Sequence, residues 1–168
     1  PGGRHEIERP DSEFGDFVTL CEEIASVTGK RGKRDLLSAY LTSLDDADLA
    51  IAASFLSGNP LPRSGGVRAA NVGWALVRHA ILDLTGLPLV HYRRVSSTQS
   101  DVVRTTHLIL RGRTDPAPHS LAEVADFFAR LAGTPSQREK IALLVEALGR
   151  FHHTEAALVV GILIGDLR

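Results

Sequence analysis

The stretch TGKRGKRDLLSAYL, residues 28–41, decides how the rest of the chain is interpreted. It places two glycines among four positive charges and then repeats apolar residues at helical spacing. An offset of 107 positions aligns it with PSQREKIALLVEAL, residues 135–148. The aligned arginine and lysine do not follow from helical periodicity alone. The sequence therefore predicts an internal repeat, which runs without a gap over residues 14–58 and 121–165.

Each copy of the repeat predicts three helices, with a basic turn between the first and the second. In the first copy an apolar stripe begins at Phe14, and Asp45 or Asp46 is placed to cap a third helix that closes near Gly58. In the second copy Ser120 and Ser136 each stand three residues before a glutamate, as in a capping box, and the last helix is expected at 155–164, after Thr154.

The residues between the two copies predict connecting helices. A fourth helix is expected at about 70–84, whereas residues 86–119 are hard to interpret, and 102–110 fits a helix or a strand. Little of the sequence has the alternation of a strand. We therefore expect an all-α fold of two pseudo-symmetric three-helix units plus connecting helices, with a flexible arm at 1–13 and one domain at 14–168.

Composition excludes several classes of protein. The net charge of −1 and the pI near 6.8 argue against a protein that coats nucleic acid, so any anion site needs its positive charge gathered on one face. The single cysteine excludes an internal disulfide and indicates a cytoplasmic protein. No apolar run is long enough to cross a membrane. The chain lacks a starting Met, and we expect a monomeric piece of a longer protein.

The two basic turns are the candidate binding site. TGKRGKR combines glycines, cations and the N–H groups of a helix that begins near Lys33, which together favour phosphate. It lacks the Walker A spacing, and a solvated turn between helices would have the same composition. PSQREK, residues 135–140, occupies the equivalent position, and the recurrence favours a binding function for both turns.

No arrangement in the sequence predicts a catalytic centre. The adjacent His152 and His153 cannot face one metal from a helix, and we expect surface or capping histidines. Cys21 lies on an apolar stripe, where a thiol stays protonated, and Trp74 is expected to be half-buried. The carboxylates near Asp45 stand where a helix N-terminus favours negative charge.

These stretches together resemble the N-terminal DNA-binding domain of ATP-dependent DNA ligases, in particular bacterial ones. TGKRGKRDLLSAYL before a helix that closes in FLSG is similar to the start of that domain, and VGWALV, residues 72–77, to its middle. GTPSQREKIALLVEAL and a helix ending in ILIGDLR are similar to its close. The resemblance covers about residues 14–168 and implies an all-helical domain with internal pseudo-twofold symmetry, placed across the minor groove at a nick.

The resemblance also implies which residues contact DNA, in three turns. The first turn would supply Thr28, Gly29, Lys30, Arg31 and Lys33; the second Ser136, Gln137, Arg138 and Lys140; the last Gly165, Asp166 and Arg168. The ligase signature, a lysine followed by x-Asp-Gly, is absent from the chain. The adenylated lysine, the metal-binding carboxylates and the OB domain are therefore expected elsewhere in the polypeptide.

The function that the resemblance implies is sequence-independent binding of nicked duplex DNA. The full ligase would use ATP and Mg²⁺ to form an AMP intermediate and seal the nick in DNA replication, repair and recombination. This chain alone would hold no cofactor or metal, be inactive, and have the duplex and the catalytic domains of its own polypeptide as partners. The alternative from the residues is a helical-repeat scaffold that binds protein, with solvated basic turns.

Overall fold

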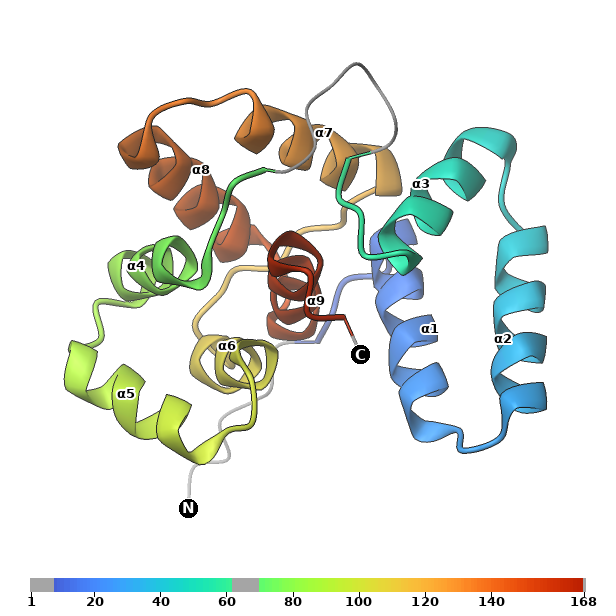
Figure 1. The fold of residues 1–168 in the computed structure, drawn as a ribbon, viewed down its shortest axis with the longest axis horizontal. Helices are drawn as coiled ribbons and strands as arrows, with labels where there is room; N and C mark the ends of the chain where they lie inside the picture. The colour runs from blue at the N-terminus through green and yellow to red at the C-terminus, as the bar shows by residue number, and fades with distance from the viewer. Residues whose placement is uncertain (1–7, 62–69, 168) are drawn as a thin grey trace.

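The computed structural model describes residues 8–61 and 70–167, and every regular element in those two ranges is an α-helix. This confirms the expected all-α fold. The helices, arranged as in Figure 1, are α1 (Glu13–Ser26), α2 (Lys30–Thr42), α3 (Asp46–Leu56), α4 (Trp74–Thr85), α5 (Leu89–Thr98), α6 (Val102–Leu110), α7 (Leu121–Ala132), α8 (Gln137–Arg150) and α9 (His153–Ile164).

The helix starts follow the sequence offset closely. α2 and α8 begin 107 positions apart, and so do α3 and α9. Side-chain caps explain several of these starts, because a hydroxyl or carboxylate accepts from an otherwise unpaired backbone N–H. Asp45 caps α3 by accepting from the N–H of Asp48 at 2.8 Å, and Ser120 caps α7 by accepting from that of Glu123 at 3.0 Å.

The start of the last helix differs from the expectation. The helix was expected at 155–164, but α9 begins at His153 and its N-cap is His152, whose ring accepts from the N–H of Thr154. The carboxylate of Glu155 in turn accepts from the N–H of His152 at 3.1 Å, which completes a capping box. Both histidines are buried, so His152 has the capping role we expected, but neither lies on the surface.

The segment between the two copies forms two further helices. α5 and α6 occupy most of 86–119, and 102–110 is a helix because Asp101 caps it through the N–H of Arg104 at 2.7 Å. Its buried residues, Thr105, Thr106, Ile109 and Leu110, recur at helical and not at strand spacing. The fourth helix, α4, begins at Trp74 and not near 70.

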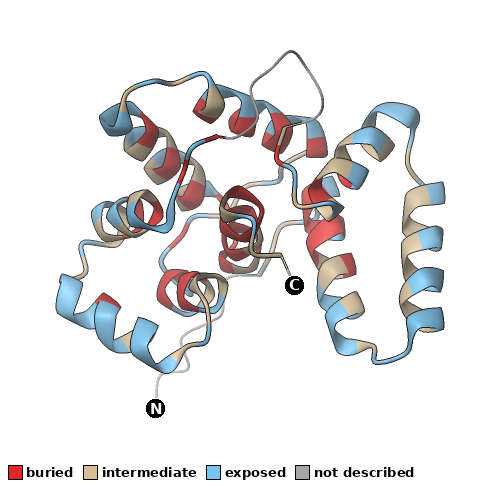
Figure 2. Ribbon diagram, in the orientation of Figure 1, coloured by how far each residue is buried: buried red, intermediate tan, exposed pale blue. Residues whose placement is uncertain are grey.

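The core is organised around α9 and a closed cycle of contacting phenylalanine side chains. α9 packs on α6 and α1, and nearly all of its residues are buried (Figure 2). All six phenylalanines of the chain contact one another in a cycle with ring centroids 5.3–6.5 Å apart. The cycle runs from Phe14 through Phe17, Phe55, Phe128, Phe127 and Phe151 back to Phe14. It joins both repeat copies into one core.

Candidate nucleic-acid interface

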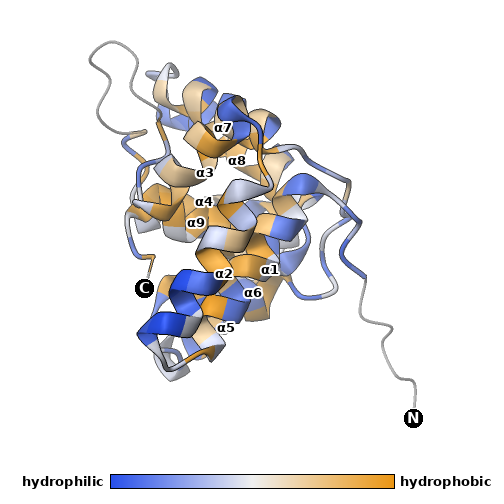
Figure 3. Ribbon diagram, turned by 90° about the vertical axis from the view of Figure 1, so that its right-hand side faces the viewer, coloured by the Kyte–Doolittle hydropathy of each residue, from blue (hydrophilic) through white to orange (hydrophobic). Residues whose placement is uncertain are grey.

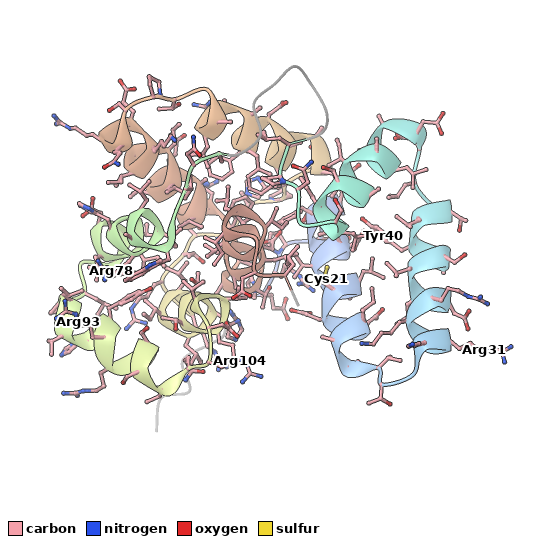
Figure 4. The ribbon with its side chains drawn as sticks, in the orientation of Figure 1. Cys21, Arg31, Tyr40, Arg78, Arg93 and Arg104 are labelled. Atoms are coloured by element: carbon pink, nitrogen blue, oxygen red, sulfur yellow. The ribbon has the colours of Figure 1, made fainter. Side chains whose placement is uncertain are left out.

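The α1–α2 turn presents an open helix start and exposed cations. Gly29 is the N-cap of α2 and supplies no side-chain cap, and the first turn of α2 contains no acidic residue. Lys30 and Arg31 are exposed, and Arg31 points away from the body of the protein (Figure 4). Figure 3 shows this end of α2 as strongly hydrophilic. The partial positive charge at the N-terminus of α2 therefore lies next to the full positive charges of Lys30 and Arg31.

Two further residues of this turn have distinct roles. A Cβ at Gly32 would lie 2.9 Å from Cγ1 of Val27, so glycine lets the start of α2 pack closely on the end of α1. Lys33 is half-buried, and its ammonium group has no hydrogen bond or ion pair among residues 8–61 and 70–167. Thr28, like Lys30, is exposed. The turn is thus a rigid support for cations that have no protein partner.

The α7–α8 turn has a different environment. Ser136 caps α8 by accepting from the N–H of Glu139 at 3.4 Å, and Gln137 and Arg138 are exposed. Lys140, which we expected at the same surface, is only 7 % exposed. Its ammonium donates to the carbonyl of Ala70 at 2.9 Å. The Lys140 side chain therefore anchors the segment before α4 and does not face solvent, which corrects our expectation for this residue.

The third turn closes α9. Gly165 has a φ of +71°, a left-handed backbone that favours glycine, and Gly58 at the end of the first copy has +74°. No atom lies within 4 Å of a Cβ built at Gly165, so its backbone is open to approach from outside. The N–H of Asp166 donates to the carbonyl of Gly161 at 2.9 Å, which fixes the turn. Arg168 lies outside the described residues.

The three turns do not gather into one pocket. In Figure 1 the α1–α2 turn lies at the lower right, the start of α8 at the upper left, and the C-terminal turn between them. The two basic turns can therefore act as a pair, as we expected, only if the ligand is long enough to reach both of them. A compact anion could not contact both, whereas a double helix could.

Sequence reasoning missed a groove between α4 and α8. The groove has a volume of about 1070 Å³ and an apolar floor that includes Leu76, Ile141 and Val145. Arg78 lines it beside the expected site residue Arg138. It also passed over the charge of the segment that follows, because residues 84–114 contain five arginines and a single acidic residue.

The described ranges hold neither a reactive cysteine nor a cluster of metal-ligating side chains. Burial raises the pKa of the Cys21 thiol to about 12, and the neighbouring Glu22 adds to the rise, so this cysteine is an inert packing residue. In residues 8–61 and 70–167 no three His, Cys, Asp or Glu side chains come together as metal ligands would. None of the helices described has the length and hydropathy of a membrane span.

Comparison of the sequence with known proteins identifies relatives of this chain. Residues 13–168 match the family model described as DNA ligase N terminus. A protein of Opitutus terrae named Probable DNA ligase is 27 % identical over 96 % of this chain, and one of the same name from Koribacter versatilis is 27 % identical over 90 %. A DNA ligase of Methanosphaerula palustris is 25 % identical over 93 % of the chain. The chain spans only 19 %, 26 % and 29 % of these relatives' own lengths.

Proposed function

The chain belongs to the family of DNA ligase N-terminal domains, and from this membership we propose that it binds nicked duplex DNA through the phosphates that border the minor groove. In this role it holds the duplex in position while the remainder of a ligase seals the nick. The observation that carries the proposal is the placement of exposed cations and open backbone turns along an extended path across the molecule.

Phosphate is the chemical group that the α1–α2 turn suits best. The first N–H groups of a helix lack partners within the helix, and a bound anion can satisfy them. α1 and α3 carry acidic residues in their first turns, which satisfy this preference internally, whereas α2 carries none. Lys30 and Arg31 add full positive charges at the same place. An external anion therefore completes the start of α2.

Backbone contacts also explain why recognition would be independent of sequence. Phosphate and sugar contacts fix the register of a protein on a duplex without distinguishing bases. The left-handed turn at Gly165 would let a sugar–phosphate chain approach the main chain closely. Arg138 would contribute at the far end of the path, at the start of α8. Such binding weakens steeply as salt rises.

ATP and Mg²⁺ do not fit the residues present in this chain. None of its three lysines is followed by x-Asp-Gly, and the described part of the chain holds no carboxylate cluster for a metal. Lys140 is moreover held by main-chain carbonyls. We therefore propose that adenylation and nick sealing take place in the remainder of the ligase. The contribution of this domain is binding and positioning.

The test is charge reversal at the two basic turns. We expect Lys30→Glu/Arg31→Glu/Arg138→Glu to weaken binding of a fluorescent nicked duplex at least tenfold and to reduce the slope of log affinity against log salt, since each lost phosphate contact removes about 0.9 from that slope. Fluorescence anisotropy at two salt concentrations measures both quantities, and circular dichroism checks that helicity is kept.

A matched control separates local contacts from general repulsion. Ala47→Glu/Ala50→Glu/Ala122→Glu lowers the net charge by three at exposed positions outside the turns, as Lys30→Gln/Arg31→Gln/Arg138→Gln does within them, and should leave most of the affinity that the Gln variant loses. Equal loss in both variants, or unchanged affinity of the reversal variant at low salt, would contradict the assignment. The scaffold alternative predicts no dependence on the turns at all.

A further inference from the structure

An exposed tryptophan lies at the start of α4. Trp74 is the only tryptophan of the chain and is 54 % exposed, so it is about half-buried, as expected, and leaves about half of its surface open to solvent. The guanidinium of Arg78, one turn later, lies 4.4 Å from the centroid of its ring. This cation–π contact holds the indole in place at the surface. The exposed indole and the guanidinium beside it therefore offer an aromatic face and a positive charge side by side at the surface.

The neighbouring helix α5 adds unpaired positive charge to the same corner. Arg93 and Arg94 are exposed, and neither has an ion pair among residues 8–61 and 70–167. Arg78 lies close enough to α5 to act on Tyr92, whose pKa is raised by burial and lowered in part by this guanidinium. Figure 4 shows Arg78 and Arg93 on these adjoining helices. The start of α4 and the exposed arginines of α5 therefore lie at the same corner of the molecule.

The groove between α4 and α8 connects this corner to the α7–α8 turn. Arg78 and Arg138 both line it. Lys140 binds the carbonyl of Ala70 near the start of α4, and Gly149 approaches Leu84 near its end, so the two helices run in the same direction. The acidic residues of the groove, Asp83 and Glu146, occupy the positions toward the helix ends, and Asp83 pairs with His79 at 3.7 Å.

We propose that this surface, formed by Trp74, Arg78, Arg93, Arg94 and Arg138, binds single-stranded DNA that continues from the duplex, such as a flap at the nick. Arginines along a groove suit a flexible sugar–phosphate chain, and an exposed aromatic ring stacks on any base. Bases inside a duplex are already stacked, so Trp74 favours an unpaired strand. The inference rests on the proposed function, because the duplex delivers the strand to this surface.

The unique tryptophan makes the proposal directly measurable. We expect a nicked duplex with a short single-stranded flap to quench the fluorescence of Trp74, and the same nicked duplex without a flap to leave it nearly unchanged. The flap should also tighten binding about five-fold or more, the lower end of the range for one stacked base. Quenching to the same extent by both duplexes, or by neither, would overturn the single-strand assignment.

Two pairs of variants identify the groups responsible. Trp74→Ala and Arg93→Glu should each remove the affinity gained from the flap, as measured by anisotropy of labelled DNA. Leu108→Ala, at another exposed apolar residue, and Arg104→Glu, on α6, should each retain it. Loss in the controls equal to that in the test variants would contradict the proposal. If the nicked duplex without a flap binds normally in all four variants, the proposed binding of duplex DNA is supported, whether or not the flap adds affinity.

Discussion

The two repeat copies share their helix boundaries but not their surroundings. α2 packs on α1 and has no buried residue, whereas its counterpart α8 packs on α4 and buries Lys140, Leu144 and Leu148. α3 buries only Ala52 and Phe55, whereas its counterpart α9 lies in the centre of the molecule. One sequence pattern has thus produced a protruding helical hairpin in one copy and a core in the other.

The segment between the copies causes this difference. α4 and α6 cover α8 and α9, and among the described helices none covers α2 in the same way. The uncovered copy keeps its cations free at the turn, and the covered copy uses one of them to hold the segment before α4. An internal repeat therefore predicts where helices begin, while the chain outside the repeat determines which of their faces bind a ligand.

The largest expected effect comes from aligned leucines. Leu144→Ala should lower the free energy of unfolding by about 2–5 kcal/mol, because it opens a cavity where the side chain is fully buried. The aligned Leu37 is half-buried, and Leu37→Ala should cost about 1 kcal/mol. Chemical denaturation of both variants measures the difference. Equal costs would mean that α2 is as well packed as α8.

The aligned lysines should separate stability from binding. Lys140→Met should lower the free energy of unfolding by about 1.5–3 kcal/mol, the usual contribution of a charged hydrogen bond, because the Ala70 carbonyl loses its partner. Lys33→Met should change stability by less than about 0.5 kcal/mol and weaken binding of nicked DNA. Chemical denaturation and fluorescence anisotropy of both variants test whether Lys140 serves stability and Lys33 serves DNA binding. A destabilised Lys33→Met variant with normal DNA affinity would contradict this assignment.

The smallest expected effect concerns the aligned carboxylates Asp48 and Glu155. Burial raises the pKa of Glu155, and one of its oxygens has no hydrogen bond within the described ranges. The folded state thus favours the neutral acid, and the wild type loses stability as pH rises from the ordinary pKa through the raised one. Glu155→Gln is neutral throughout and keeps the acceptor for His152. Its stability relative to the wild type should therefore increase as the pH rises above the ordinary pKa of a glutamate.

The matched variant in the first copy is Asp48→Asn. Asp48 lies in the first turn of α3, where negative charge is favourable, so its neutralisation should cost about 0.3–1 kcal/mol near neutral pH. Thermal unfolding of both variants from the ordinary pKa of a glutamate up to neutral pH provides the measurement. A gain in stability for Asp48→Asn, or a constant difference for Glu155→Gln, would show that the two positions are not distinguished by burial.

The helices were predictable because their boundaries depend on nearby residues. Asp45 and Ser120 act as caps as their positions predicted, and glycines in left-handed backbone follow the third helix of each copy. The start of α9 lies two residues before the expected one, because the side chain of His152 accepts the capping hydrogen bond that a hydroxyl more often accepts. Local chemistry was therefore sufficient for the fold class and for most helix starts.

The environments of individual side chains were not predictable in this way. Lys140 appeared equivalent to Lys33, but its burial depends on a segment 70 positions earlier in the chain. Trp74 has apolar neighbours in sequence, but it is the first residue of its helix and faces outward. The basic surface on α5 has no counterpart in either repeat copy. Each of these features is set by contacts distant in sequence, which periodicity does not encode.

The cycle of six phenylalanines in the core also constrains how the chain folds. Phe14 and Phe17 close their cycle only through Phe128, Phe127 and Phe151, more than 100 positions later, and Arg9 bonds to Thr154. Folding rates fall as contacts become more distant in sequence. During synthesis the first three helices would leave the ribosome with their apolar faces uncovered. Those faces would stay exposed until α7 and the later helices, which supply their aromatic partners, have been synthesised. Assembly of the core is thus a late event, although every regular element in residues 8–61 and 70–167 is a helix.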